Sequence, residues 1–265
     1  MNSDAPTNSF ILPKTYLFCG NEAYKGVCVE SLYALEKRIT ELFLHTIKYC
    51  SSETFSPDSW QPMDLAVFPG GTCSEWDELL GKAKLKDFLA WFERGGRVLA
   101  VCAGAYYFSS HSIYQAAMDN SISRLRDAAL FSGLCQGPVF DPGVQVVKIH
   151  WEETQQEGYA ITIGAGALIP QEPGNGEYRV LARFVDNYQK DSIAVVSCKK
   201  GNGVGILSTV HWEFDSLHLL KVKCVLQKTP EQMQVMMQNL DRSASFRESC
   251  FKKIMSELIT RPSTL

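Results

Sequence analysis

The thiol of Cys102 is the reactive group that the sequence places most conspicuously. It follows Arg97 and the apolar residues 98–101, and the small residues Ala-Gly-Ala come directly after it. Small residues around one nucleophile are typical of a sharp turn from a strand into a helix, which lifts the side chain above the edge of the sheet. The helix dipole would then favour the thiolate. The same residues also fit a buried cysteine in an apolar strand, so two interpretations stay open.

A cysteine nucleophile needs a base, and His211 is the best placed histidine. It follows the apolar residues 204–210, where a late strand leaves the sheet, and Glu213 comes two residues later. Alternate residues of an extended chain point to the same side, so Glu213 could hold the imidazole. The other histidines are expected to be structural (His45 and His218), at the surface (His111) or a weaker candidate for the base (His150).

Two glycine-rich segments follow strand-like runs. Pro69-Gly70-Gly71 could offer backbone N–H groups as an oxyanion hole, although a simple tight turn is the more common use of this sequence. The Gly-Ala-Gly-Ala segment that begins at Gly164 could line a pocket or allow close packing. No group of His, Cys, Asp and Glu residues has metal-ligand spacing, so we expect no metal and no cofactor.

The elements that would position these groups alternate between strands and helices. Apolar strand-like runs are at residues 15–19, 45–49, 64–68 and 97–101, and helical periodicity is at residues 27–43, 76–80 and 85–94. This order predicts an α/β fold with an open, mostly parallel sheet flanked by helices, whose ligands bind at the carboxyl ends of the strands. The loops after Cys19 and Phe68 and the turn at Cys102 would gather there.

The second half predicts extra antiparallel strands and C-terminal helices. Residues 105–130 are expected to form one or two helices, and the Gly- and Pro-rich residues 131–143 a loop. A hairpin is expected at residues 200–203. The further expected elements are strands at 144–151, 159–163, 178–185, 193–199 and 204–209, and helices at 217–227, 230–240 and 245–259.

Composition narrows the class of protein. The 265 residues are 45% hydrophobic and 21% charged, as is ordinary for a soluble globular protein. A net charge of −3 favours no nucleic-acid partner. The nine cysteines are scattered without a C-x-x-C pair, which predicts a reducing compartment rather than a disulfide framework or a zinc module. With no signal pattern and no apolar run long enough to span a bilayer, we expect a cytoplasmic protein without a membrane partner.

The expected organisation is one α/β domain with additions. Residues 1–13 are expected to be a flexible lead-in, and residues 14–216 the α/β domain. Residues 217–265 are expected to form a helical extension that packs on the same domain.

Together these motifs resemble the class I glutamine-amidotransferase-like superfamily. The resemblance rests on Phe-Pro-Gly-Gly at residues 68–71, Val-Cys-Ala-Gly-Ala-Tyr-Tyr at residues 101–107 and His-x-Glu-Phe at residues 211–214. More narrowly, the chain resembles the amidotransferase-like domain at the N-terminus of eukaryotic biotin–protein ligases, which also occurs alone in bacteria. Phe-Cys-Gly at residues 18–20 and Gly-x-x-x-Gly-Pro at residues 133–138 carry the narrower match.

The resemblance implies a flavodoxin-like sheet and a Cys-His-Glu site. By this comparison Cys102 is the nucleophile, His211 the general base and Glu213 the group that orients it. The backbone amides of Gly71 and Ala103 would form the oxyanion hole. The expected residues of the substrate pocket are Gly20, Gly70, Tyr106, Tyr107 and Gly164.

The chain departs from the superfamily in three places. Ala100 stands where the superfamily usually has glycine, Trp212 stands in the usual His-Pro-Glu, and Tyr106 takes the position of a glutamine that glutaminases carry. The change at Tyr106 argues against glutamine as the substrate. No segment resembles the Gly-Arg-Gly-Arg-type loop of biotin ligases, so we expect that this chain alone does not ligate biotin.

Three functions therefore stay open. The first is a cysteine-dependent amidase, amidotransferase or related hydrolase that acts on a small-molecule substrate. The second is a non-catalytic ligand-binding or regulatory module of biotin or carboxylase metabolism, with a biotin-related enzyme as its partner. The third is a redox or carbonyl-stress role.

Overall fold

The computed structural model describes most of the chain. The described residues are 13–21, 23–43, 46–117, 120–127, 129–141, 143–171, 177–185, 192–221 and 228–259. The expected flexible lead-in, apart from Pro13, and His45 lie outside the described residues. No helix within these ranges is long and apolar enough to cross a membrane.

A parallel sheet forms the centre of the fold. Its strands are β1 (Lys14–Phe18), β2 (Thr46–Cys50), β3 (Leu65–Phe68), β4 (Arg97–Val101) and β13 (Gly203–Ser208). They lie in the order β2-β1-β3-β4-β13, and every neighbouring pair is parallel. The predicted α/β fold with an open sheet is confirmed, and the carboxyl ends of β3, β4 and β13 meet at one edge.

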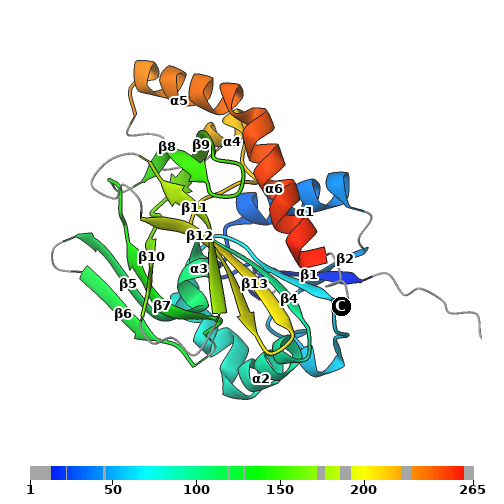
Figure 1. Ribbon diagram of the computed structural model, residues 1–265. Coiled ribbons are helices and arrows are strands. Elements are labelled where there is room, and N and C mark those ends of the chain that lie inside the picture. Colours follow the sequence, from blue (N-terminus) through cyan, green and yellow to red (C-terminus); the bar gives the residue numbers. More distant parts are fainter. Residues whose placement is uncertain are drawn as a thin grey trace, which may run out of the picture.

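Strands that pair antiparallel, apart from the parallel pair β5 and β7, extend the sheet beyond β13 (Figure 1). The hairpin predicted at residues 200–203 joins β12 (Ile193–Lys200) to β13. The sheet continues through β10 (Ala167–Pro170), β7 (Phe131–Gly137), β5 (Ser109–Ala117) and β6 (Asn120–Leu125). From β12 it branches through β11 (Glu177–Phe184), β8 (Val144–Trp151) and β9 (Gln156–Ile163).

Two expectations for the middle of the chain are wrong. Residues 105–130 form only one short helix, α3 (Ala103–Tyr107), before β5 and β6 begin. The expected loop at residues 131–143 contains β7, in which every second residue is buried. This two-residue period places one side of β7 in the core, and the burial outweighs the turn preference of its glycines.

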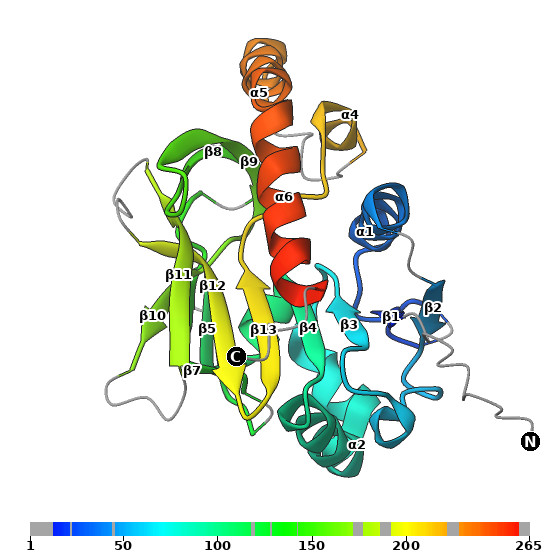
Figure 2. The same ribbon diagram turned by 45° about the vertical axis from the view of Figure 1, so that its right-hand side comes forward.

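Helices cover both faces of the parallel sheet (Figure 2). On one face, α1 (Val29–Leu42) and α6 (Ala244–Ile259) pack against Leu99 and Val101 of β4. On the other face, α2 (Trp76–Glu93) and α3 pack against Val98 and Ala100. Residues 98–101 of β4 are all apolar because both faces of the strand are covered.

The remaining helices differ slightly from the expected ranges. The two helices expected at residues 76–80 and 85–94 form the single helix α2, which is interrupted at Gly81 (φ 69°, ψ 158°). The expected helix at residues 217–227 is described only as α4 (Ser216–Leu219), and residues 222–227 lie outside the described residues. The helix expected at residues 230–240 is α5 (Pro230–Arg242). Short 3₁₀ turns are at Pro57–Ser59 and Cys73–Glu75.

Candidate active site

Cys102 stands between the end of β4 and the start of α3. Its backbone has φ 52° and ψ −105°, a conformation that non-glycine residues rarely adopt. The Cys102 amide donates a hydrogen bond of 2.7 Å to the carbonyl of Ser208, the last residue of β13. The side chain is largely buried, and its thiol donates a 3.6 Å hydrogen bond to the carbonyl of Ile163. The turn is therefore held by the neighbouring strand, and the thiol faces β9.

His211 is fixed at the end of the segment that follows β13. Its backbone amide donates a 2.8 Å hydrogen bond to the carbonyl of Ile161. Its Nδ1 atom lies 2.7 Å from Oε1 of Glu213, and the ring stacks on Phe214 at a centroid distance of 4.7 Å. The side chains of His211 and Glu213 are both buried. Contacts on three sides thus leave the imidazole one orientation, in which Nε2 is the ring nitrogen without a hydrogen bond among the described residues.

The electrostatics of His211 favour its protonated form. Burial alone works to lower the pKa of the imidazole, because it removes water from the charged ring. The carboxylate of Glu213 and the thiol of Cys102 outweigh burial and raise the pKa of His211 to about 10. A protonated His211 would balance the charge of Glu213 inside the protein.

Ser31 joins the site from α1. Its hydroxyl donates a 2.7 Å hydrogen bond to Oε1 of Glu213, and it accepts a 3.2 Å hydrogen bond from the backbone amide of Gly70. Sequence reasoning missed this residue. The sequence does show a serine among the apolar residues of one face of this helix. In the structure Ser31 is fully buried. A buried hydroxyl in such a stripe needs a partner, and here the partner is Glu213.

The Pro-Gly-Gly turn after β3 packs tightly around the site. A Cβ atom on Gly70 would lie 2.8 Å from Cε1 of His211 and 3.5 Å from Cβ of Cys102. Gly71 has a φ of 149°, and a Cβ atom there would lie 2.4 Å from the carbonyl oxygen of Gly26. The absence of a side chain at Gly70 lets the turn approach His211, and its absence at Gly71 lets the turn approach Gly26.

A cavity of about 250 Å³ opens beside Cys102. Gly71 and Ala103, the residues expected to supply the oxyanion hole, both line it. Tyr106 and Gly164 also line it, and the Tyr106 hydroxyl donates a 3.0 Å hydrogen bond to the Gly164 carbonyl. The thiol of Cys102 and Tyr106 thus line the same cavity as Gly71 and Ala103.

Three of the expected pocket residues do not line the cavity. Gly20 accepts a hydrogen bond from the Ser52 amide and does not line the cavity. Tyr107 is buried against Trp76 and lies under the guanidinium of Arg126, at 4.7 Å from its ring centroid. Its side chain packs in the core between α2 and α3 because adjacent helical residues point in different directions. Gly70 contacts His211 without being part of the cavity wall.

Sequence reasoning also missed the contribution of the β5–β6 hairpin. Arg126, which follows β6, is buried, lines the cavity and forms an ion pair with Asp77 of α2. Its Nη2 atom lies 4.0 Å from the sulfur of Cys73, another residue of the cavity wall. Arg124 of β6 is exposed and lines the same cavity. The sequence predicts helices at residues 105–130, and that prediction gives no indication that Arg124 and Arg126 line the cavity.

None of the described histidines lines the cavity itself, and His211 lies behind it beside Gly70 and Cys102. His111 lies in β5, where its Nε2 atom is 2.9 Å from the hydroxyl of Ser123. His150 lies in β8, with Nδ1 3.9 Å from Glu157. His218 caps α4 together with Asp215.

A family model and one curated relative point to the same family. A family model described as biotin-protein ligase, N terminal, matches residues 18–263. A biotin–protein ligase of Schizosaccharomyces pombe is 26% identical over 216 residues, which cover 76% of this chain and 33% of that protein. An uncharacterized protein of Chlamydia muridarum is 24% identical over 208 residues, which cover 74% of this chain and 76% of that protein. The aligned region thus spans only about a third of the yeast ligase.

Solved structures with low sequence identity share the fold. A glutamine amidotransferase from Thermotoga maritima has a TM-score of 0.54 at 11% identity, over 95% of this chain and 100% of that chain. PurLQS from the same organism has a TM-score of 0.54 at 12% identity, over 86% of this chain and 99% of that chain. The β-galactosidase Gan42B has a TM-score of 0.51 at 9% identity and is covered over 31% of its length. At these identities the likeness establishes the fold alone.

Proposed function

The chain belongs to the family of biotin–protein ligase N-terminal domains, on an amidotransferase-like fold, and on this premise we propose that it is a cysteine-dependent hydrolase or amidotransferase. Cys102 is the nucleophile, His211 the base and Glu213 the group that orients the base. The observation that carries the proposal is the buried chain of hydrogen bonds from Gly70 through Ser31 and Glu213 to His211. Such a chain fixes one orientation of an imidazole that stands beside a thiol.

The chemistry would proceed through a covalent intermediate. The sulfur of Cys102 bonds to the carbonyl carbon of the substrate, and the thiol proton is held by Nε2 of His211. The carbonyl oxygen becomes an oxyanion and accepts hydrogen bonds from the amides of Gly71 and Ala103. His211 then gives the proton to the leaving amine as its bond to carbon breaks, which leaves a thioester on Cys102. Water or a second amine attacks the thioester, transfers its proton through His211 and frees the thiol.

The substrate class is a small molecule other than glutamine. By the resemblance, Tyr106 stands at the sequence position where glutaminases carry glutamine, and its hydroxyl donates a hydrogen bond to the Gly164 carbonyl. We also propose that the chain alone does not ligate biotin, since its sequence has no loop of the Gly-Arg-Gly-Arg type. Its scattered cysteines, of which every described one is free, support a cytoplasmic location.

A second function is favoured by one feature of the site. The Cys102 thiol donates its hydrogen bond to the Ile163 carbonyl, and Nε2 of His211 has no hydrogen-bond partner among the described residues. This arrangement suits a ligand-binding or regulatory module that keeps the cavity without turning over a substrate. In that case the partner would be an enzyme of biotin or carboxylase metabolism.

Alkylation of the native protein distinguishes the two functions. Iodoacetamide labelling is followed by mass spectrometry at each cysteine, with the more exposed Cys28 and Cys73 as internal controls. The catalytic function predicts that Cys102 reacts at least about tenfold faster than these two, and that Glu213→Gln removes most of this advantage. If Cys102 reacts no faster than in the denatured chain, the catalytic function is rejected.

The binding function predicts that Cys102→Ala keeps any thermal stabilisation produced by a ligand. Screening cell metabolites for covalent adducts on Cys102 would then identify the substrate class.

A further inference from the structure

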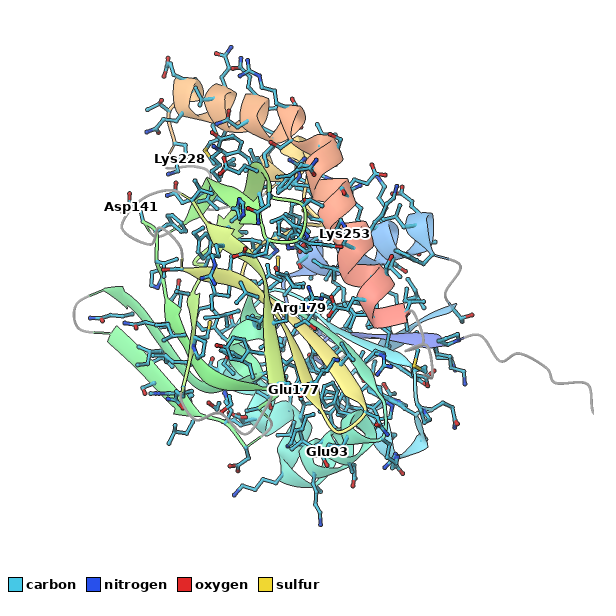
Figure 3. All side chains as sticks on the ribbon, in the orientation of Figure 1. Glu93, Asp141, Glu177, Arg179, Lys228 and Lys253 are labelled. Atoms are coloured by element: carbon cyan, nitrogen blue, oxygen red, sulfur yellow. The ribbon has the colours of Figure 1, made fainter. Side chains whose placement is uncertain are left out.

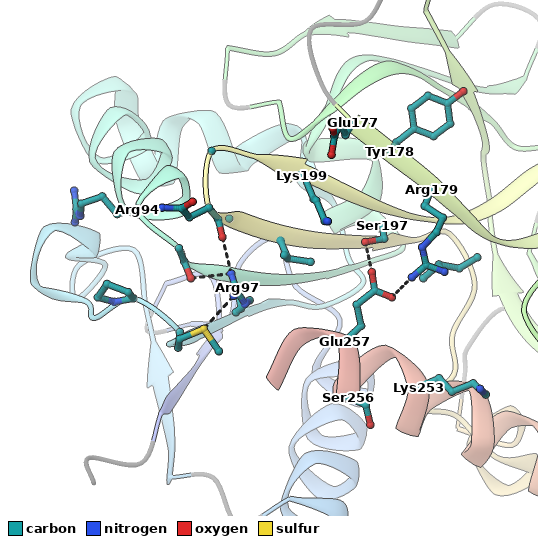
Figure 4. Close-up of a pocket in the computed structure, with 18 of the residues that line it drawn as sticks. Arg94, Arg97, Glu177, Tyr178, Arg179, Ser197, Lys199, Lys253, Ser256 and Glu257 are labelled. Carbon is teal, nitrogen blue, oxygen red and sulfur yellow. Dashed lines mark hydrogen bonds and ion pairs between the residues drawn. The ribbon is translucent and has the colours of Figure 1, made fainter. Parts of the chain in front are cut away.

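Figure 4 shows a groove of about 1230 Å³. It lies at the start of β4, whereas Cys102 follows the end of this strand. Its walls come from the start of β4, the β12–β13 turn, β11 and α6. Arg97 is the first residue of β4 and Cys102 follows the last, so one strand of roughly 16 Å separates the two sites. The groove plays no part in the proposed cysteine chemistry.

Arg97 is a buried cation in the wall of this groove. Only 3% of the residue is exposed. Its Nη1 atom donates hydrogen bonds of 2.9 Å to the carbonyls of Gly95 and Asn202, and its Nη2 atom contacts the sulfur of Met63. Among the described residues, its buried Nε atom has no hydrogen-bond partner, and no carboxylate forms an ion pair with the guanidinium. Burial without a counter-charge is costly for a guanidinium, and it lowers the pKa of Arg97.

The other charges of the groove do not neutralise Arg97. Five basic and three acidic side chains line the groove. Two of the acidic groups are already paired, Glu257 with Arg179 at 2.6 Å and Glu153 with Lys253 at 2.8 Å. These pairs connect α6 with the sheet, and Figure 3 shows Lys253 on α6 above Arg179 on β11.

The charges outside those pairs are mainly positive. Arg94, Arg97 and Lys199 remain, and Glu177 is the acidic group that accompanies them. The groove therefore carries an excess of two positive charges in a chain whose net charge is −3. A local field of this sign attracts anions to the groove.

Lys199 is the cation best placed to meet a ligand. It extends from β12 into the space between Arg97 and Glu257 (Figure 4). The residue is exposed and forms no ion pair with a described residue. Buried Trp151 and Leu181 add apolar surface to the same wall. The groove thus offers cations beside an apolar surface, which is how sites for small organic anions are built.

We propose that this groove is a second binding site, which takes a small organic anion. Its carboxylate or phosphate group lies between Arg97 and Lys199, and its apolar part lies along Trp151 and Leu181. The bound anion supplies the counter-charge that Arg97 lacks.

Calorimetric titration tests the site with two probes, pyrophosphate for phosphates and citrate for carboxylates. Both are titrated into the full chain at constant ionic strength. We expect saturable binding of at least one probe, weakened about tenfold or more by Lys199→Ala and equally by Lys199→Gln. Lys200→Ala is the matched control, because Lys200 is the next residue of the strand and pairs with Glu93 instead. It should bind as the wild type does, and so should Cys102→Ala, whether or not Cys102 is catalytic.

Three results would overturn the proposal. The first is that neither probe binds. The second is that the wild type and both folded Lys199 variants bind equally well. The third is that Lys200→Ala loses as much binding as the Lys199 variants do. Retained melting temperature checks that each variant is folded. Whichever probe binds identifies the anionic group that the site prefers.

Discussion

Ser31 donates a 2.7 Å hydrogen bond to Glu213, although 182 positions separate these two residues in the chain. The bond goes to Oε1, the same oxygen that contacts the imidazole of His211. The Oε2 atom is buried and has no hydrogen-bond partner among the described residues. One oxygen of Glu213 therefore connects the first helix of the fold to the base at the end of its last strand.

Replacing Ser31 should weaken the hold of Glu213 on the His211 side chain without changing the fold. Ser31→Ala removes one hydrogen bond to a buried carboxylate, so the free energy of unfolding should fall by about 1–3 kcal/mol. The alkylation rate of Cys102 should fall as well, because Glu213 then holds His211 less firmly. Urea unfolding and iodoacetamide labelling measure the two effects. Thr40→Ala is the control on the same helix, since Thr40 is exposed and bonds only to the Glu36 carbonyl. An equal effect in both variants would contradict the role of Ser31.

The stability of the fold should depend on pH through His211. Its pKa rises from 6.5 in the unfolded chain to about 10 in the folded protein, so the folded state binds the proton more tightly. The stability that protonated His211 adds to the folded state is fully present below about pH 6.5. It is lost as the pH rises through about 10. Urea unfolding across this range should show a steeper decline for the wild type than for Glu213→Gln, which lacks the carboxylate. Parallel curves for the two proteins would rule out this coupling.

A methyl group at Gly70 should block the site while leaving the fold intact. In Gly70→Ala the new Cβ would lie 2.8 Å from the His211 ring, so we expect the ring to leave its position beside Cys102. We expect the selective alkylation of Cys102 to be lost, with only a small change in melting temperature. Gly205→Ala serves as the control, because its Cβ would first meet the flexible Leu130 side chain at 3.3 Å. Rapid labelling of Cys102 in Gly70→Ala would show that the contact between ring and thiol is unimportant.

The hydroxyl of Tyr106 should matter for stability. Tyr106→Phe leaves the carbonyl of Gly164 without its 3.0 Å hydrogen bond, which should reduce the free energy of unfolding by about 1 kcal/mol. Tyr16→Phe is the comparison, since the Tyr16 ring stacks on Trp60 away from the cavity. Thermal unfolding measures both variants. No loss in Tyr106→Phe would mean that water replaces the hydroxyl.

The sequence was informative where one physical requirement dominated. Strands covered on both faces are apolar along most of their length, which is why β3, β4 and β13 could be recognised. The parallel order then brings the residues after them to one edge, so the closeness of Cys102, His211 and the Gly70 turn followed from topology. Whether these residues catalyse a reaction stays a prediction.

Other parts depend on contacts between distant segments. The β5 and β6 strands mix polar and apolar residues without a clear period, because their burial is set by their neighbours in the sheet. Ser31 reads as an ordinary helical serine until Glu213 is placed against it. Arg97 likewise reads as the polar start of a strand, and its lack of a carboxylate partner emerges only from the packed structure.

The adjacency of β4 and β13 also constrains how the protein is made. Arg97 of β4 bonds to the carbonyl of Asn202, 105 positions later in the chain, just before β13 begins. A nascent chain that has not yet reached β13 exposes the backbone of β4 as an open edge, apolar on both sides. Such an edge pairs readily with other chains, so slow synthesis or truncation within the antiparallel strands should promote aggregation. Completing β13 both closes this edge and delivers His211 to the thiol.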